Sequence, residues 1–346
     1  MTKKEAPAST AEMEKLEVKE DKKPKNWEHI PREMKEIVVK AMDIITRTRL
    51  KMCSKADKTL VESIPIDISV MKAYSHFEIR CNAAERSPDC KFVASDLHHR
   101  FFVLDDFKFS QNVDKVIIWR NNKKRVIKLK TEDEATKMLN GWYYGILNDK
   151  SVRIDQFYTE WVFKGNLISE TRRIPIKSLE IKHNKADECT DWLKHIDPVI
   201  EKIVVGSRPP HHMETMGGVG VLPCILYAKD LDLFVTDIND EQVVNFEAKS
   251  IRIVKSNVTV VGIRNLIKKW IDKDYPIDSK FSINLKSNST RNEITDEIIN
   301  GIDCGIENET TTDAKILMGA NKIIRITPFD TRKVNGVIEG RNLNTN

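Results

Sequence analysis

The hydrophobic pattern near the start of the chain predicts a helix. Pro31 is well placed for the first turn of a helix, because it lacks a backbone N–H and has a fixed φ. After it, apolar residues recur at i, i+3, i+4, i+7 and i+11, which is the spacing of one helix face. These stripe positions are Met34, Ile37, Val38, Ala41 and Ile45.

Residues 47–63 predict two more short helices. Polar residues from Arg47 to Arg49 interrupt the stripe, so a second helix is expected to begin with Leu50 and Cys53. Ser54 or Asp57 is a suitable N-cap for a third, which carries Leu60 and Val61. A bundle of this size buries too little surface to be robust alone and is expected to offer apolar side chains to a partner.

From residue 64 the pattern changes to short strands and helices. Ile66, Ile68 and Val70 alternate with polar residues, as in a half-buried strand. Further strands are expected at residues 92–94, 101–104, 115–119 and 126–129. Residues 132–147 carry apolar side chains at helical spacing and predict a longer helix.

The second half of the chain predicts strand–helix units. Strands are expected at 178–181, 201–205, 251–254 and 281–285, with helices at 187–196 and 259–271. Leu179 to Ile203 spans 24 positions and Ile253 to Ile283 spans 30, which is the size of leucine-rich-type repeats. Such connections favour parallel strands joined by right-handed crossovers. Loops are expected at 206–221 and 304–313, and one or two last strands within 323–337.

Composition narrows the class of protein. Hydrophobic residues form 40% of the 346, and the net charge is +5, from 57 Lys and Arg against 52 Asp and Glu. These charges are interspersed, so no nucleic-acid partner is expected, although Lys123–Arg125 and Lys268-Lys269 keep that role open as an alternative. No apolar run reaches about 18–20 residues, so we expect no membrane partner and a cytoplasmic or nuclear protein.

Candidate catalytic and metal-binding residues are sparse. The six cysteines form no CxxC pair. Adjacent histidines on a strand point to opposite faces, so His98-His99 suggests no metal site, and a site at His211, His212 and Met213 remains a minor alternative. Gly217–Gly220 lacks the spacing of a dinucleotide-binding loop. We therefore expect no enzyme activity, no cofactor and no metal.

Three features in order resemble an F-box: the Ile30-Pro31 pair after Trp27, the apolar pair Ile37-Val38, and the segment from Leu50 to Cys53. The sequence of this segment is similar to those of the nematode F-box families that carry a C-terminal FTH or related F-box-associated domain. Segments 178–181, 197–203 and 246–270 resemble that second domain. The resemblance implies an F-box over 26–66 and a β/α, leucine-rich-repeat-like domain over 67–335. Residues 1–25 have few large apolar residues and are expected to be a disordered leader, and the polar residues 336–346 a flexible tail. The fold class expected is thus α+β or α/β.

The resemblance also implies a function. An F-box protein is the substrate-recognition adaptor of an SCF-type ubiquitin ligase: its F-box binds a Skp-family adaptor, and through it cullin, while the second domain binds a target protein. The alternative is an interaction scaffold without a ligase role. The residues implied to contact the Skp adaptor are Trp27, Ile30, Pro31, Met34, Ile37, Val38, Leu50 and Cys53.

Overall fold

The computed structural model describes residues 27–74, 101–104, 107–112, 114–120, 123–160, 167–182, 186–206, 215–234, 236–287, 290–309 and 313–341. The expected leader, the expected strand at 92–94 and both histidine pairs lie outside these residues. Close contacts divide the chain into two units, Met1–Ile64 and Pro65–Asn346. Among the described residues, no helix combines the length and apolar character needed to cross a membrane.

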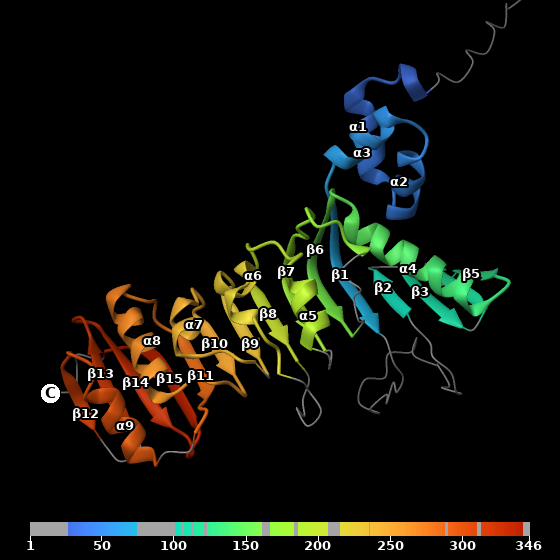
Figure 1. Ribbon diagram of the computed structural model, residues 1–346. Helices are drawn as coiled ribbons and strands as arrows, with labels where there is room; N and C mark the ends of the chain where they lie inside the picture. The colour runs from blue at the N-terminus through green and yellow to red at the C-terminus, as the bar shows by residue number, and fades with distance from the viewer. Residues whose placement is uncertain are drawn as a thin grey trace, which may run out of the picture. The chain divides into compact units, whose positions relative to one another are not determined.

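The first unit consists, in its described part, of a 3-10 turn and three helices (Figure 1). The turn is η1 (Trp27–His29), and the helices are α1 (Arg32–Ala41), α2 (Ile44–Lys51) and α3 (Lys55–Ser63). The Ser54 hydroxyl accepts a hydrogen bond from the Asp57 N–H and caps α3, as predicted. The expected start of the second helix was wrong. Asp43 caps α2 by accepting from the Thr46 N–H, so Leu50 lies near the end of α2 and Cys53 lies beyond it.

The second unit is built on one sheet with fifteen strands in its described part. The strand order is β12-β13-β14-β15-β11-β10-β9-β8-β7-β6-β1-β2-β3-β4-β5. The strands are β1 (Ile66–Tyr74), β2 (Phe101–Leu104), β3 (Phe107–Asn112), β4 (Lys115–Arg120), β5 (Lys123–Lys128), β6 (Val152–Thr159), β7 (Ile176–Ile181), β8 (Lys202–Val205), β9 (Asp230–Leu233), β10 (Ser250–Ile253), β11 (Lys280–Asn284), β12 (Ile306–Glu309), β13 (Ala314–Met318), β14 (Lys322–Pro328) and β15 (Lys333–Gly340). The helices are α4 (Glu132–Asn148), α5 (Ala186–Leu193), α6 (Pro223–Leu226), α7 (Asp240–Asn245), α8 (Val260–Asp272) and α9 (Arg291–Ile299), with the turn η3 (Val219–Val221).

The middle of the sheet is parallel and both ends are antiparallel. Strand β1 and strands β6 to β11 run parallel, and β6 to β11 follow one another in sequence order. Each helical connection therefore leads to the neighbouring strand, as a right-handed crossover does. The expected mixed α and β class and the parallel strands joined by helices are confirmed at this level.

Buried residues repeat at i, i+3 and i+5 along β1 and along β6 to β10, counting from a residue at or just before the strand. On β7 they are Ile176, Leu179 and Ile181, each at most 2% exposed. The register aligns the i+3 positions across seven strands: Met71, Phe157, Leu179, Ile203, Leu231, Ile251 and Phe281. On β6 to β10 the two residues between i and i+3 are polar and lie outside the core, so each of these strands presents a pair of polar positions before its buried pair.

The helices cover one face of the sheet, the face that carries this buried ladder (Figure 1). The Phe157 ring centroid lies 5.3 Å from that of Trp192 on α5 and 6.5 Å from that of Tyr143 on α4. The ring centroid of Trp270 on α8 lies 5.5 Å from that of Phe281. The opposite face carries the polar positions of the strands and has no helix over it in the described part of the unit.

Several elements differ from the predictions. Strands β3, β6, β9, β12 and β13 and helices α6, α7 and α9 were not expected. Strand β12 occupies part of the expected loop at 304–313, and η3 lies within the expected loop at 206–221, whose residues 207–214 are outside the described part. Residues 336–340, expected in the flexible tail, belong to β15. Gly336 is needed there, because a Cβ would lie 2.2 Å from Cε1 of the buried Phe281 ring.

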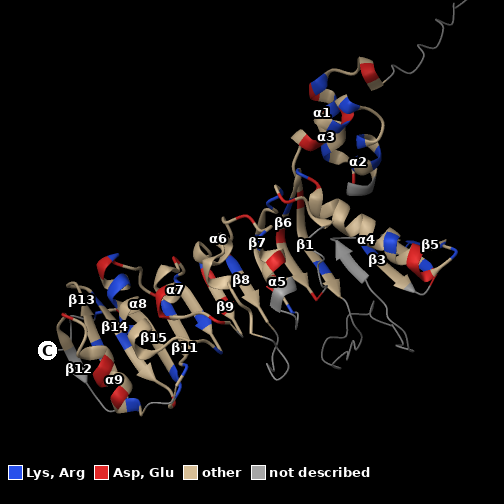
Figure 2. Ribbon diagram, viewed as in Figure 1, with Lys and Arg blue, Asp and Glu red and all other residues tan. Residues whose placement is uncertain are grey.

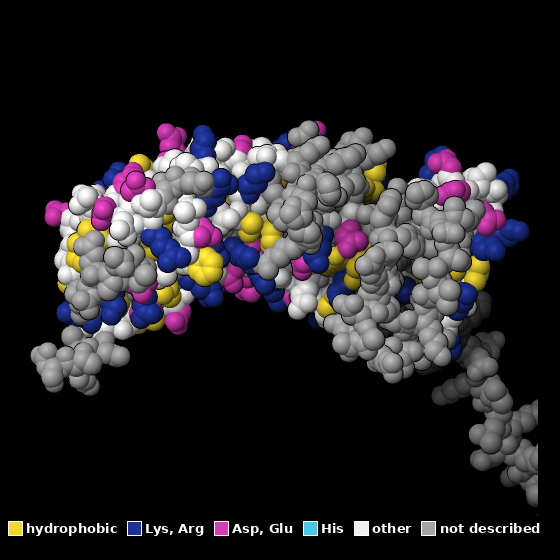
Figure 3. All heavy atoms as spheres, turned by 90° about the horizontal axis from the view of Figure 1, so that it is seen from below, with side chains coloured by type: hydrophobic (Ala, Val, Ile, Leu, Met, Phe, Trp, Pro, Cys, Tyr) yellow, Lys and Arg dark blue, Asp and Glu magenta, His cyan; other side chains and the backbone are white. Residues whose placement is uncertain are grey.

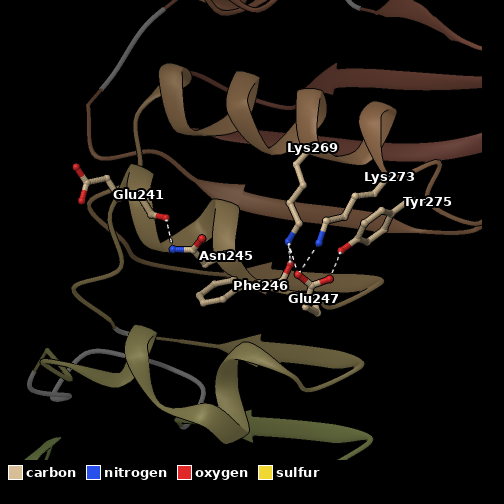
Figure 4. A network of polar contacts seen from close by, with 7 residues as sticks. All are labelled: Glu241, Asn245, Phe246, Glu247, Lys269, Lys273 and Tyr275. Carbon is tan, nitrogen blue, oxygen red and sulfur yellow. Dashed lines mark hydrogen bonds and ion pairs between the residues drawn. The ribbon is translucent and has the colours of Figure 1, made fainter.

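A polar network joins the end of α8 to the segment before β10 (Figure 4). The Glu247 carboxylate accepts hydrogen bonds from Lys273 Nζ at 2.9 Å, Lys269 Nζ at 3.2 Å and the Tyr275 hydroxyl at 3.4 Å. Burial raises the pKa of the Glu247 carboxyl, but the hydrogen bonds from the two lysines outweigh it, so this pKa is below its ordinary value. Burial and the Glu247 charge raise the pKa of Tyr275 to about 12.

The depressed pKa of Glu247 predicts a pH-dependent contribution to stability. A carboxyl with a lower pKa in the folded state stabilises the fold above its unfolded value, near 4.3, and this contribution is lost as the pH falls through the folded value. We expect Glu247→Gln to lower the free energy of unfolding at pH 7 by less than about 1 kcal/mol, because the carboxylate is partly exposed.

Urea denaturation at several pH values measures this contribution. The difference in free energy of unfolding between Glu247→Gln and the unmodified chain should be constant above about pH 5 and should fall toward zero below about pH 4. Glu241→Gln is the matched control, because the carboxylate of Glu241 has no partner among the described residues. A difference that persists unchanged at low pH would contradict the assignment of the effect to the Glu247 charge.

Candidate functional site

The helix α1 presents its apolar stripe to solvent. Met34, Ile37 and Val38 are 52%, 59% and 38% exposed, whereas Val39 is fully buried. Positions 34, 37, 38 and 41 share one face of a helix, and Ala41 is also exposed. The helix therefore packs on its own unit through Val39 and leaves a continuous apolar face uncovered in the described part of the unit.

The core of the first unit is very small. It consists of Val39 from α1 and Leu60, Val61 and Ile64 from α3 and its end, with Trp27, Met42 and Leu50 packed against them. Such a core cannot absorb the stripe as well, because four buried side chains already occupy the space between three short helices. An exposed apolar face of this kind marks an interaction site.

Trp27 is fixed to α3 rather than presented to solvent. Its Nε1 donates to Asp57 Oδ1 at 2.6 Å, and the Ser54 hydroxyl donates to Asp57 Oδ2 at 2.8 Å. The Lys35 ammonium lies 5.5 Å from the ring centroid of Trp27. Because Asp57 is buried, these bonds also satisfy its carboxylate. Trp27 thus connects η1, α1 and α3 and supports the position of the stripe.

Of the other residues implied by the resemblance, some pack on the core of the first unit and some are exposed on its surface. Leu50 packs on the core and Ile30 is half-buried, so both belong with Trp27. Pro31 is exposed directly before α1, one turn before Met34. Cys53 is exposed beyond α2, and its thiol donates to the Arg49 carbonyl at 3.5 Å. The structure therefore brings Pro31, Met34, Ile37 and Val38 together on one surface and places Cys53 on a different element.

A buried arginine, which the sequence interpretation treated as a helix break, holds the three helices together. Arg47 is 5% exposed. Its guanidinium donates to the carbonyls of Met42 and Lys40 at 3.3 Å each and to that of Ile64 at 3.2 Å. It therefore binds carbonyls at the end of α1 and at the end of α3, where cations are favoured by the helix dipole. The signal in the sequence was weak, since a polar residue in an amphipathic helix is normally exposed.

A hollow of about 540 Å³ lies on the open face of the second unit. Strands β8 to β11 and β14 and β15 line it, and the lining includes Lys202, Asp230, Asp232, Arg252, Lys280, Ser282, Arg325, Thr327 and Asn335. Its lining combines short polar side chains with long charged ones. It is assembled from strands far apart in the sequence, so spacing within one element gave no signal for it.

The charges around this hollow are mixed. Arg252 pairs with Asp232 at 3.6 Å and Arg325 with Glu339 at 2.7 Å. Lys202 and Lys280 are exposed and form no ion pair with a described residue. Over the described surface drawn in Figure 3, acidic and basic side chains are likewise interspersed, with small apolar groups between them. The hollow is suited to a polar protein segment with charges of both signs.

Neither surface has the arrangement of a reaction centre. Within the described ranges, no group of three or more His, Cys, Asp or Glu side chains is placed to hold a metal ion. Cys224 is buried, and burial raises the pKa of its thiol to about 12, so it is not an activated nucleophile.

Comparisons with known proteins add no relative. No protein-family model matches the chain, and searches of curated proteins and of solved structures find no match either.

Proposed function

We propose that the chain is a substrate-recognition adaptor of an SCF-type ubiquitin ligase, present in the cytoplasm or nucleus. Residues 27–64 bind a Skp-family adaptor, which links them to cullin, and the second unit binds the target protein. The chain performs no chemistry itself. Ubiquitin transfer is promoted because the target lysine and the ubiquitin carrier are held close together, which raises their effective concentration.

The exposed stripe on α1 is the observation that supports this proposal. A helix in a soluble protein normally turns its apolar face to its own core, but α1 turns Met34, Ile37 and Val38 outward. The three-helix unit with an incomplete core is the arrangement that an F-box requires, because an F-box completes its core against the Skp adaptor.

The open face of the sheet supports the target-binding role of the second unit. The i, i+3, i+5 pattern of buried residues matches the L-x-x-L-x-L spacing of leucine-rich repeats. The hydroxyl of Ser256, three residues after Ile253, donates to the Asn284 carbonyl at 2.8 Å. This hydrogen bond links two successive strand–helix repeats. Repeat domains of this type bind partners over an extended face. The mixed-charge hollow is the target contact we propose.

A charge placed in the stripe should abolish adaptor binding. Ile37→Glu is expected to weaken binding to a purified Skp-family adaptor by at least about 30-fold, because the carboxylate would be buried at the interface without a partner. Isothermal titration calorimetry with the full chain measures this change. Folding should be unaffected, since Ile37 is 59% exposed.

Val199→Glu is the matched control, because Val199 is an apolar residue of the second unit that is 86% exposed. It should bind the adaptor as the unmodified chain does. Unchanged adaptor affinity in Ile37→Glu, or full affinity in a chain lacking residues 27–64, would refute the proposed function.

A further inference from the structure

The positive charge of the chain is concentrated in the β4–β5 hairpin. Residues 115–130 hold seven Lys or Arg and no Asp or Glu. The whole chain carries +5, so the rest of it sums to −2, which is 5 minus 7. Figure 2 shows basic residues along this end of the sheet and acidic ones in the first turn of α4 beside it. By sequence, residues 115–130 therefore carry more positive charge than the net charge of the whole chain.

The cations of the hairpin are not neutralised within the described part of the protein. No described carboxylate forms an ion pair with Lys115, Lys123, Arg125 or Lys128. Lys115 instead lies directly opposite Lys128 in the register of β4 and β5. Like charges in opposed positions destabilise a strand pair. An anionic partner would relieve this repulsion.

The outer edge of β5 is open in the strand order, because β5 is the last strand of the sheet. The Leu129 N–H donates to the Asp114 carbonyl on the β4 side. Backbone N–H groups alternate in direction along a strand, so those of Lys124, Val126 and Lys128 point outward, away from β4. The edge thus offers donors and acceptors in the pattern that an additional strand needs.

The cations lie on both faces of the hairpin, and this favours a peptide over a nucleic acid. Lys124 and Lys128 share the open face with Trp119, whose ring centroid lies 5.9 Å from the Lys124 ammonium and 5.5 Å from that of Lys108. Lys123 and Arg125 point to the opposite face. A single-stranded nucleic acid binds along one positively charged groove. A peptide that adds to the sheet as a strand points its side chains alternately to the two faces, so it contacts the cations on both.

We propose that β5 binds an acidic, extended segment of a partner protein, which adds to the sheet as a further strand. Main-chain hydrogen bonds to residues 124, 126 and 128 supply affinity, and the two rows of cations supply the preference for Glu and Asp. Lysines on an edge strand discourage pairing with neutral or basic strands. The same lysines attract a strand that carries acidic side chains. This inference does not depend on adaptor binding by the first unit.

The test uses the full chain and a short synthetic peptide rich in Glu and Val, labelled for fluorescence anisotropy. A second peptide of the same charge carries methyl groups on the backbone nitrogens that would face β5. We expect the methylated peptide to bind at least about tenfold more weakly and Lys124→Glu/Lys128→Glu to lose affinity to a similar extent. Lys229→Glu/Lys249→Glu, two exposed lysines of the same unit, should bind normally.

Val126→Pro provides a second test on the protein side. It removes one outward N–H and leaves the β4 ladder and all charges in place, so it should weaken binding of the acidic peptide, whereas Val126→Thr should not. Circular dichroism checks that both variants are folded. Equal binding of the methylated and unmethylated peptides would overturn strand addition. Tighter binding of a single-stranded oligonucleotide, insensitive to Val126→Pro, would overturn the peptide partner.

Discussion

Replacing Phe157 by alanine is expected to lower the free energy of unfolding of the second unit by about 3–5 kcal/mol. Phe157 is 2% exposed and lies in the buried ladder of β6. Its ring contacts Trp192 on α5 and Tyr143 on α4, so it packs two helices onto the parallel part of the sheet. Alanine would leave a cavity that two large, fixed aromatic rings cannot collapse to fill.

Equilibrium urea denaturation of the full chain measures this loss through the shift in the midpoint at constant slope. Gln156→Ala is the matched control, because residue 156 is adjacent on the same strand but exposed on the open face. It should change stability by less than about 0.5 kcal/mol. A loss below about 1 kcal/mol for Phe157→Ala would contradict the assignment of the ladder as the core of the unit.

The long helices were predictable because their sequences contain complete local signals. For α4, the apolar spacing, the acidic first turn and the N-cap Thr131 all agree with the helix at Glu132–Asn148. The expected range of 132–147 differs by one residue. Here local preference and tertiary packing select the same element, so the pattern alone sufficed.

Strand β9 shows why other elements were missed. Asp230–Leu233 is four residues long and has only two apolar positions, so alternation gave too little signal. Its extended form comes from pairing with β8 and β10. A search for the i, i+3, i+5 pattern would have found it, since Ala228, Leu231 and Leu233 repeat the spacing of Ile200, Ile203 and Val205.

The residues of the exposed stripe could be predicted, and the small size of the bundle predicted that it would offer apolar side chains to a partner. Which helix face would be exposed could not be predicted. Periodicity shows that Met34, Ile37 and Val38 share a face, but it does not show whether this face is buried. The choice is made by α3, whose Leu60 and Val61 pack on Val39 instead. The hollow on the open face could not be predicted from spacing, because Lys202 and Arg325 become neighbours only through the order of the strands.

Replacing Arg47 by methionine is expected to lower the stability of the first unit by about 2–4 kcal/mol. Methionine keeps most of the length of the side chain but removes hydrogen bonds to three carbonyls, two of which are only partly buried and can bond to water instead. A buried hydrogen bond from a charged donor is worth about 1.5–3 kcal/mol. At least one of these carbonyls, that of Ile64, is bonded in a buried setting and would lose its donor without gaining water. In a unit with only four buried apolar residues in its core cluster, this loss should open the bundle.

Hydrogen exchange of the amides in residues 32–63, followed by mass spectrometry on the full chain, measures this opening. Arg49→Met is the matched control, because Arg49 lies on the same helix and is exposed, and it should change protection little. The proposed function also predicts that Arg47→Met weakens binding of a Skp-family adaptor although Arg47 is not on the stripe, because only the folded fraction of the unit presents Met34, Ile37 and Val38 together. Unchanged protection in Arg47→Met would show that the buried guanidinium is not what holds α1, α2 and α3 in place, and the orientation of the stripe would then need another cause.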